Sequence, residues 1–330
     1  MNQKTSKLKV GDVVMVISPS GSLKKGSSVF KLAEENFLNV FGLKIKYSKN
    51  SGKLNSYGTS SIDERIRDFH EAFKNPQVKG IICSTGGFNS NELLKFIDWN
   101  LIKDNPKPFI GSSDNTVLIN AIYTKTGIKT YFGPNYYKFG MKLGLKYTLD
   151  YFQKCLLESS AYAVLPSKKW SNDKWYKNQD ERSFYQNKGY QIINEGEARG
   201  TIIGGNLCSL NLLQGTEFMP SLRSSILLIE DDDLAGDNTF GEFNRNLQSL
   251  LSLPGAESIK GIVVGRFQPS SGIDLKKIKY IINTKQELKN IPIIVNADFG
   301  HTDPMAVFPI GGILEMSAKN GVIDIKIINH

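Results

Sequence analysis

The amino-acid sequence predicts an α/β protein in which an N-terminal α/β sandwich domain with a parallel sheet is followed by a smaller mixed α/β C-terminal domain. Three observations support this expectation. The 330 residues are too many for one typical core and suit two domains. Short apolar runs alternate with helical patterns in the first half, which favours a parallel sheet between helices. A polar stretch then separates this half from a second series of strands.

Strand and helix patterns alternate through the first half, which we expect to form one domain over residues 1–165. Val13–Ile17 is an apolar strand, Ser28–Phe41 has helical periodicity, and residues 43–47 return to a strand pattern. A helix, a strand, a helix and a strand are then predicted at 61–73, 80–83, 91–97 and 108–110.

Residues 166–198 form a polar segment without sustained periodicity, too long for a simple connection in a compact protein. Its six aromatic side chains disfavour disorder: Trp170, Trp175, Tyr176, Phe184, Tyr185 and Tyr190. We interpret this segment as the crossing between the domains and as a loop that faces the substrate.

The second domain is expected over residues 199–330. It contains predicted strands at 225–229, 261–264 and 291–295, a predicted helix at 240–251, and a terminal hairpin with its turn at 319–321. Together the two halves predict a cleft between the domains, with the active site in that cleft.

Composition limits the classes of partner. With 40% hydrophobic and 22% charged residues, the chain is typical of a soluble globular protein. It has no signal-peptide pattern and no segment of membrane-spanning length, so we expect a cytoplasmic protein without a membrane partner. The net charge of +9 comes from scattered lysines without a nucleic-acid-binding motif. We therefore expect no nucleic acid polymer as a partner, but a basic surface that helps an anionic substrate approach.

Metal and disulfide chemistry receive little support from the sequence. Cys83, Cys155 and Cys208 are widely separated and form no C-x-x-C pair. Four consecutive acids, Glu230 to Asp233, are compatible with a metal site, but a solvated charge cluster is the usual meaning of such a run. We expect no metal and no cofactor.

A Ser-Glu-His set can be assembled by elimination. Of the three histidines, His301 alone stands at a strand-to-loop corner, although a loop histidine without a role explains it equally well. Glu230 is the one acid of its run attached to a buried strand, where it can orient a histidine. Ser113 lies where a strand enters a helix, and its corner is also an ordinary helix cap. Asn115 in the second position after Ser113 excludes the G-x-S-x-G elbow.

Backbone donors for an oxyanion can also be proposed. The Gly86-Gly87 turn lets N–H groups approach a ligand closely, and the Asp114 amide lies at a helix start. The Gly87 and Asp114 amides are therefore candidate oxyanion donors. A tight turn or a phosphate-binding loop is the alternative for the glycines, but the chain lacks G-x-G-x-x-G and G-K-[ST].

Six segments, in order, carry a resemblance that spans nearly the whole chain. They are STGGFNSNELL at 84–94, GSSDNT at 111–116, YFGPN at 131–135, GGNL at 204–207, LLIED at 227–231 and NADFGHTDP at 296–304. Together they resemble the LD-carboxypeptidase family of serine peptidases. The resemblance implies that Ser113, Glu230 and His301 are the catalytic serine, glutamate and histidine.

The insertion with WSNDKWY at 170–176 resembles the microcin C self-immunity, or MccF-like, branch of that family. This implies cleavage of the amide between an aminoacyl or peptidyl group and a nucleotide mimic, a role in antibiotic resistance, a homodimer without metal, and a tryptophan stacked on the nucleobase. We favour Trp175 because Tyr176 and Asp173 anchor it, with Trp170 as a close alternative. Gly86 and Asn206 are further candidates for contact with a peptide or peptidyl-nucleotide substrate.

Two other functions stay open. An LD-carboxypeptidase would remove the terminal D-residue from a murein tetrapeptide. A two-domain binding protein would hold a small ligand in the cleft without turnover, but the missing export signal and the Ser-Glu-His set argue against it.

Overall fold

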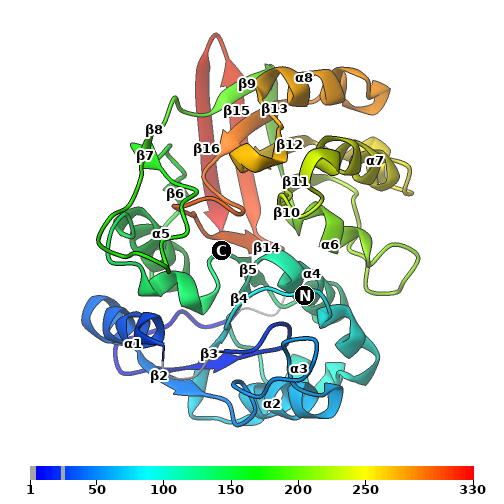
Figure 1. Cartoon of the computed structure of the whole chain (residues 1–330). Helices are drawn as coiled ribbons and strands as arrows, with labels where there is room; N and C mark the ends of the chain where they lie inside the picture. Colours follow the sequence, from blue (N-terminus) through cyan, green and yellow to red (C-terminus); the bar gives the residue numbers. More distant parts are fainter. Residues whose placement is uncertain (1–4, 24–26) are drawn as a thin grey trace.

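The computed structural model describes residues 5–23 and 27–330, which form two large sheets, one in the lower and one in the upper half of Figure 1. The predicted fold class is confirmed: a parallel sheet dominates the N-terminal half, and a mixed sheet dominates the C-terminal half.

The first sheet has six strands in the order β14-β5-β4-β3-β1-β2. The five strands from the N-terminal half are parallel, whereas β14 pairs antiparallel with β5. The strands are β1 (Val13–Ile17), β2 (Lys44–Tyr47), β3 (Val78–Cys83), β4 (Phe109–Gly111), β5 (Thr130–Phe132) and β14 (Phe308–Ile310).

Five α-helices accompany the strands of this half in the described residues. The helices of this half are α1 (Ser28–Phe41), α2 (Ile62–Lys74), α3 (Trp99–Asp104), α4 (Thr116–Thr126) and α5 (Lys146–Leu156). Ser61 and Glu64 form a reciprocal capping box at the start of α2. The helix predicted over 91–97 is the 3₁₀ segment η1 (Ser90–Phe96), whose first N–H is held by the Asp114 carboxylate at 2.8 Å.

The second sheet has eight strands in the order β6-β16-β15-β10-β11-β12-β13-β9. Strands β10 to β13 are parallel, and the flanking strands are antiparallel. The strands are β6 (Tyr162–Ala163), β9 (Gln191–Asn194), β10 (Gly196–Asn206), β11 (Ser225–Glu230), β12 (Gly261–Gly265), β13 (Ile293–Ala297), β15 (Ile313–Lys319) and β16 (Val322–Asn329). Three α-helices accompany this sheet: α6 (Leu207–Asn211), α7 (Thr239–Leu251) and α8 (Leu275–Asn283).

The two sheets share one hydrophobic core. Phe132 at the end of β5 meets Phe299 edge-on, and Phe299 in turn meets Phe308 of β14. The chain also crosses between the sheets, because β6 joins β16 and β14 joins β5. The shared core fixes the two halves against each other, and the domain limits at 165 and 198 stay a prediction.

The segment 166–198 is fixed to the body of the protein. Its short strands β7 (Lys169–Trp170) and β8 (Tyr185–Gln186) pair with each other. Ser171 exchanges two backbone hydrogen bonds with Asp303, of 2.7 and 2.9 Å. The segment therefore reaches the loop that carries His301.

Within residues 5–23 and 27–330, no helix is long and apolar enough to cross a membrane. The three cysteines are free, and only Cys208 is exposed. In the same part of the chain, no group of three or more His, Cys, Asp or Glu side chains is arranged to hold a metal ion.

Candidate active site

The corner after β4 holds Ser113 in an unusual backbone conformation. Ser113 has a φ of 59°, in the left-handed region that non-glycine residues rarely adopt. The surrounding side chains hold this conformation: Asn135 Oδ1 accepts from the Ser112 N–H at 3.1 Å, and Asn115 Nδ2 donates to the Thr85 carbonyl at 2.9 Å. Backbone strain maintained by its neighbours is a common feature of functional sites.

Asp114 supports the corner from behind. Its carboxylate accepts from the Ser20 hydroxyl at 2.5 Å and from the Ser90 N–H at 2.8 Å, while the Ser90 hydroxyl donates to its carbonyl. The side chain of Asp114 is therefore structural. No hydrogen bond from its own N–H, or from that of Gly87, is found among the described residues.

The structure brings the three members of the predicted triad together. His301 Nε2 lies 3.2 Å from Ser113 Oγ, and His301 Nδ1 lies 2.7 Å from Glu230 Oε2. Glu230, the last residue of β11, is 1% exposed. With the ring proton on Nδ1, His301 donates to Glu230 and leaves Nε2 to accept the serine proton, which is the geometry of nucleophilic catalysis.

The electrostatics of the site act on His301. Burial lowers the pKa of His301, but the charge and hydrogen bond of Glu230, together with the charge of Asp232, raise it, and the net result is a pKa above the ordinary value. Lys138 opposes this increase. Glu230 therefore stabilises the imidazolium form that a general base must pass through.

The acids that follow Glu230 have separate roles. Asp231 is buried and accepts from the Asn206 amide and from the Asp232 N–H, both at 3.2 Å. Burial, and then the charges of Glu230 and Asp232, raise the pKa of Asp231 to about 7. Asp233 accepts a hydrogen bond from the hydroxyl of Ser270, which lies in the segment after β12. Of the four acids, Glu230 is the one hydrogen-bonded to His301 in the described structure.

The Gly86-Gly87 turn faces the serine closely. A Cβ on Gly86 would lie 2.8 Å from Ser113 Cβ and 2.9 Å from Ser113 Oγ, and a Cβ on Gly87 would lie 2.7 Å from the Gly21 nitrogen. Side chains are excluded at both positions, so backbone N–H groups can approach the space beside the serine.

Ser113 and His301 line a cavity of about 240 Å³ between the two halves. Three of its lining residues lie outside the segments quoted from the sequence: Tyr137, Lys138 and Leu234. Lys138 is buried in an ion pair, with its Nζ 2.7 Å from Asp303 Oδ1. Phe88 lies within the STGGFNSNELL segment but was not singled out, and only their positions next to the YFGPN segment and the acidic run could have suggested the other three.

Comparison with known proteins identifies the family of the chain. The model of the LD-carboxypeptidase N-terminal domain matches residues 14–133, and that of the C-terminal domain matches residues 199–316. The chain belongs to the LD-carboxypeptidase family. The resemblance found in the sequence is thereby confirmed.

The similar proteins include carboxypeptidases, named as putative, and MccF or MccF-like proteins. "Putative carboxypeptidase YocD" of Bacillus subtilis is 45% identical, over 98% of this chain and 99% of YocD. The microcin C7 self-immunity protein MccF of Escherichia coli is 33% identical, over 96% of this chain and 94% of MccF. The crystal structure of an MccF-like protein from Bacillus anthracis is 46% identical, with a TM-score of 0.98 over 99% of this chain and all of that one. The structure of MccF in complex with aspartyl sulfamoyl adenosine is 30% identical in sequence to this chain, with a TM-score of 0.86. The match covers 99% of this chain and 98% of MccF.

Trp175, the favoured candidate for stacking on the nucleobase, is buried in the structure of this LD-carboxypeptidase family member, and its stacking role stays a prediction. Trp175 is 3% exposed, and it packs with Met141 and Leu145 in a small separate core. Its ring lies nearly parallel to that of Tyr137, with centroids 5.7 Å apart. In this conformation the ring is a packing element of the loop, because its faces are covered by protein.

Trp170 and Asn206 are also engaged within the protein. Trp170 is half-buried, stacks on Tyr185 at 4.7 Å between centroids and lies 5.0 Å from the Arg266 guanidinium carbon. Asn206 caps α6, since its Oδ1 accepts from the Ser209 N–H at 3.0 Å. Neither residue lines the cavity of Ser113.

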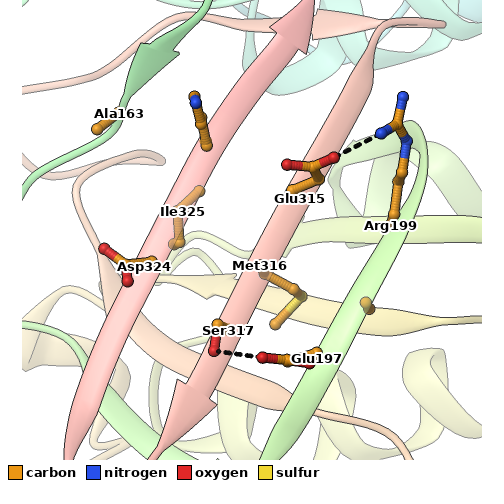
Figure 2. Close-up of a pocket in the computed structure, with 10 residues that line it drawn as sticks. Ala163, Glu197, Arg199, Glu315, Met316, Ser317, Asp324 and Ile325 are labelled. Carbon is orange, nitrogen blue, oxygen red and sulfur yellow. Dashed lines mark hydrogen bonds and ion pairs between the residues drawn. The ribbon is translucent and has the colours of Figure 1, made fainter.

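A larger hollow, of about 530 Å³, lies on the outer face of β10, β15 and β16 (Figure 2). Its side chains pair with one another: Arg199 lies 2.6 Å from Glu315, and Ser317 contacts Glu197. The hollow contains no histidine and no buried acid, and alternating charges across neighbouring strands are typical of a solvated sheet face. The candidate active site of this LD-carboxypeptidase family member is therefore the cavity of Ser113.

Proposed function

We propose that this protein is a metal-independent serine hydrolase that cleaves the amide between an aminoacyl or peptidyl group and a nucleotide mimic. The observation that carries the proposal is the hydrogen-bonded series from Ser113 through His301 to Glu230. Its three members come from three separate elements of a peptidase-family chain. We regard their contact as functional, because packing of the fold alone does not require these three polar side chains to meet.

Each residue has a defined task in the proposed reaction. Ser113 Oγ attacks the amide carbonyl while His301 Nε2 takes its proton, and Glu230 stabilises the imidazolium. The free N–H groups of Gly87 and Asp114 receive the oxyanion. His301 then gives the proton to the leaving nitrogen, and a water molecule activated by the same histidine releases the acyl group.

The substrate class is supported by the solved relatives. Structures of MccF contain glutamyl sulfamoyl guanosine and aspartyl sulfamoyl adenosine, which are aminoacyl groups joined to nucleotide mimics. The match to these structures covers 99% of this chain, so the fold is shared over its whole length, which supports the proposal. A role in resistance to peptidyl-nucleotide antibiotics follows from this chemistry, and a cytoplasmic homodimer stays a prediction.

Murein tetrapeptide cleavage is the second candidate. Lys138 lines the cavity and carries the positive charge that could bind the terminal carboxylate of a peptide. Asp303 already forms an ion pair with it. A carboxypeptidase would use this cation to hold the carboxylate of the departing D-residue. A binding protein without turnover is the third candidate, and it would not react with a covalent serine probe.

The test compares Ser113→Ala with Ser112→Ala on both substrate classes. Ser112 is a neighbouring serine that lines the same cavity but is not hydrogen-bonded to His301 in the described structure, so it is a matched control. We expect wild type to hydrolyse aspartyl sulfamoyl adenosine faster than a murein tetrapeptide. Ser113→Ala should lose about three orders of magnitude or more in activity. Unchanged activity in Ser113→Ala would refute the mechanism, and preference for the tetrapeptide would select the second candidate.

A further inference from the structure

A buried ion pair lies at the loop that carries His301. Lys138 Nζ lies 2.7 Å from Asp303 Oδ1, and the two side chains are only 8% and 7% exposed. Lys138 comes from the 3₁₀ segment η3 (Tyr136–Gly140) of the N-terminal half, whereas Asp303 is the second residue after His301. Lys138 also lines the cavity of Ser113 together with His301. The ammonium group is therefore held beside the histidine ring by the loop that follows the ring.

The ring otherwise has acidic neighbours. Glu230 Oε2 lies 2.7 Å from His301 Nδ1, and Asp231 and Asp232 interact electrostatically with the ring. Burial lowers the pKa of His301, Glu230 and Asp232 raise it, and the charge of Lys138 acts against that increase. A ring surrounded by acids alone would hold a proton, and it could not accept another one from the serine. A cation beside the ring counteracts this effect.

Arg182 of the segment 166–198 reaches the same ion pair. Its guanidinium side chain is fully buried and lies 2.8 Å from Asp173 and 3.7 Å from Asp303. Asp303 is therefore shared between two cations, Arg182 and Lys138. Because Arg182 offsets part of the negative charge of Asp303, the positive charge of Lys138 is not cancelled at the ring.

The surroundings of Lys138 keep its side chain ionised. Burial lowers the pKa of Lys138, but the charge of Asp303, followed by Tyr137 and more weakly Glu230, raises it, and the net pKa lies above the ordinary value. Replacing a buried ion pair by apolar side chains is often neutral or stabilising for a fold. Stability alone therefore does not explain a charged lysine at this cavity.

We propose that Lys138 is a positioning residue for the catalytic base: its ammonium opposes the acidic run at the His301 ring and keeps the ring neutral, ready to accept the proton of Ser113. Asp303 holds the ammonium in place, and Arg182 offsets the charge of Asp303. The inference rests on the proposed function for the role of His301. It gives the segment 166–198 a part in the chemistry of the site.

The experiment follows the titration of the His301 ring by NMR in the protein without substrate, with ¹³C in the histidine rings. The chain has three histidines, and His301→Gln identifies the signal. Lys138→Met should raise the midpoint of the His301 titration by about one pH unit, because the acids then act unopposed. Asp303→Asn should lower the midpoint, because the charge of Lys138 is then uncompensated. Lys138→Arg keeps the charge and should keep the midpoint of wild type.

Two further variants complete the design. Lys142→Met is the matched control, because Lys142 pairs with Asp180 at 2.8 Å on the exposed surface and does not line the cavity. Removing one partner of a buried ion pair can unfold a protein. Arg182→Gln leaves the pair of Lys138 and Asp303 intact, and it should raise the midpoint by less than Lys138→Met does.

Shifts in the same direction for Lys138→Met and Asp303→Asn would overturn the inference, as would an unchanged midpoint in Lys138→Met. If these two variants do not fold, Arg182→Gln decides, and a midpoint that falls or stays unchanged in it overturns the inference. Expected shifts in a protein that hydrolyses neither aspartyl sulfamoyl adenosine nor a murein tetrapeptide would refute the proposed catalysis and leave the role of Lys138 standing. Hydrolysis by wild type without these shifts would do the reverse.

Discussion

Replacement of Glu230 by glutamine tests the central element of the site. Glu230 is almost fully buried and contacts His301 Nδ1 at 2.7 Å. At an effective dielectric constant of about 20, opposite unit charges about 4 Å apart attract by about 4 kcal/mol. Loss of that attraction for the imidazolium corresponds to about 10³-fold in rate. The amide can also impose the wrong tautomer on the ring, which in serine proteases brings the loss to about 10⁴-fold. We therefore expect kcat to fall by about 10³- to 10⁴-fold.

The pH profile of the residual activity gives an independent readout. Burial lowers the pKa of His301, and Glu230 with Asp232 raises it above the ordinary value. Activity requires the neutral ring, so kcat/KM of wild type falls as the pH drops below this raised pKa. In Glu230→Gln the acid limb of the pH profile should move to lower pH, because burial lowers the pKa of His301 and the charge of Glu230 no longer raises it.

The assay is the initial rate of hydrolysis of aspartyl sulfamoyl adenosine between pH 5 and 9, followed by separation of the nucleoside product. Asp233→Asn is the matched control, since Asp233 belongs to the same acidic run but accepts its hydrogen bond from Ser270. Near wild-type kcat in Glu230→Gln, or a large loss in Asp233→Asn alone, would show that the wrong acid has been chosen. An acid limb that does not move would contradict the electrostatic role of Glu230.

Four further predictions concern the surroundings of the triad. Gly86→Ala should abolish detectable turnover, since its Cβ would lie 2.8 Å from Ser113 Cβ and 2.9 Å from Ser113 Oγ; activity within tenfold of wild type would contradict this geometry. Asp231→Asn should raise the melting temperature at pH 8 but not at pH 4. The raised pKa of about 7 makes ionised Asp231 unfavourable in the folded state, a cost that grows between pH 4 and 7. Trp175→Ala should lower the free energy of unfolding by about 3–5 kcal/mol in urea titrations, as expected for a buried ring, whereas Trp170→Ala should cost less. EDTA should leave turnover unchanged, and a loss of activity that a divalent ion restores would assign the acidic run to a metal.

The triad residues could be selected from the sequence because each ends or follows an apolar strand. Ser113 follows β4, Glu230 ends β11 and His301 follows β13. The carboxyl ends of parallel strands meet along one edge of a sheet, so polar residues placed there are held near each other. What the local pattern could not give was the distance between two sheets, because that distance depends on contacts between residues far apart in the chain.

The substrate contacts were harder to predict for the same reason. Trp175 and Phe88 are both aromatic residues in polar surroundings of the sequence, yet one is buried and the other is exposed. The difference arises from Met141 and Leu145, which cover Trp175 from another part of the chain. Local sequence does not encode such tertiary cover, so the burial of one ring and the exposure of the other could not be predicted from it.

The loop between His301 and β14 explains how two separate sheets hold one catalytic distance. Asp303 pairs with the buried Lys138 of the N-terminal half and, through its backbone, with Ser171 of the segment 166–198. Seven residues beyond His301, β14 then joins the N-terminal sheet at β5 and contacts β10 of the other sheet. His301 is therefore held by the strand before it in one sheet and by the strand after it in the other. Because both attachments are buried, the 3.2 Å separation of His301 and Ser113 is a property of the shared core and does not require closure of a hinge.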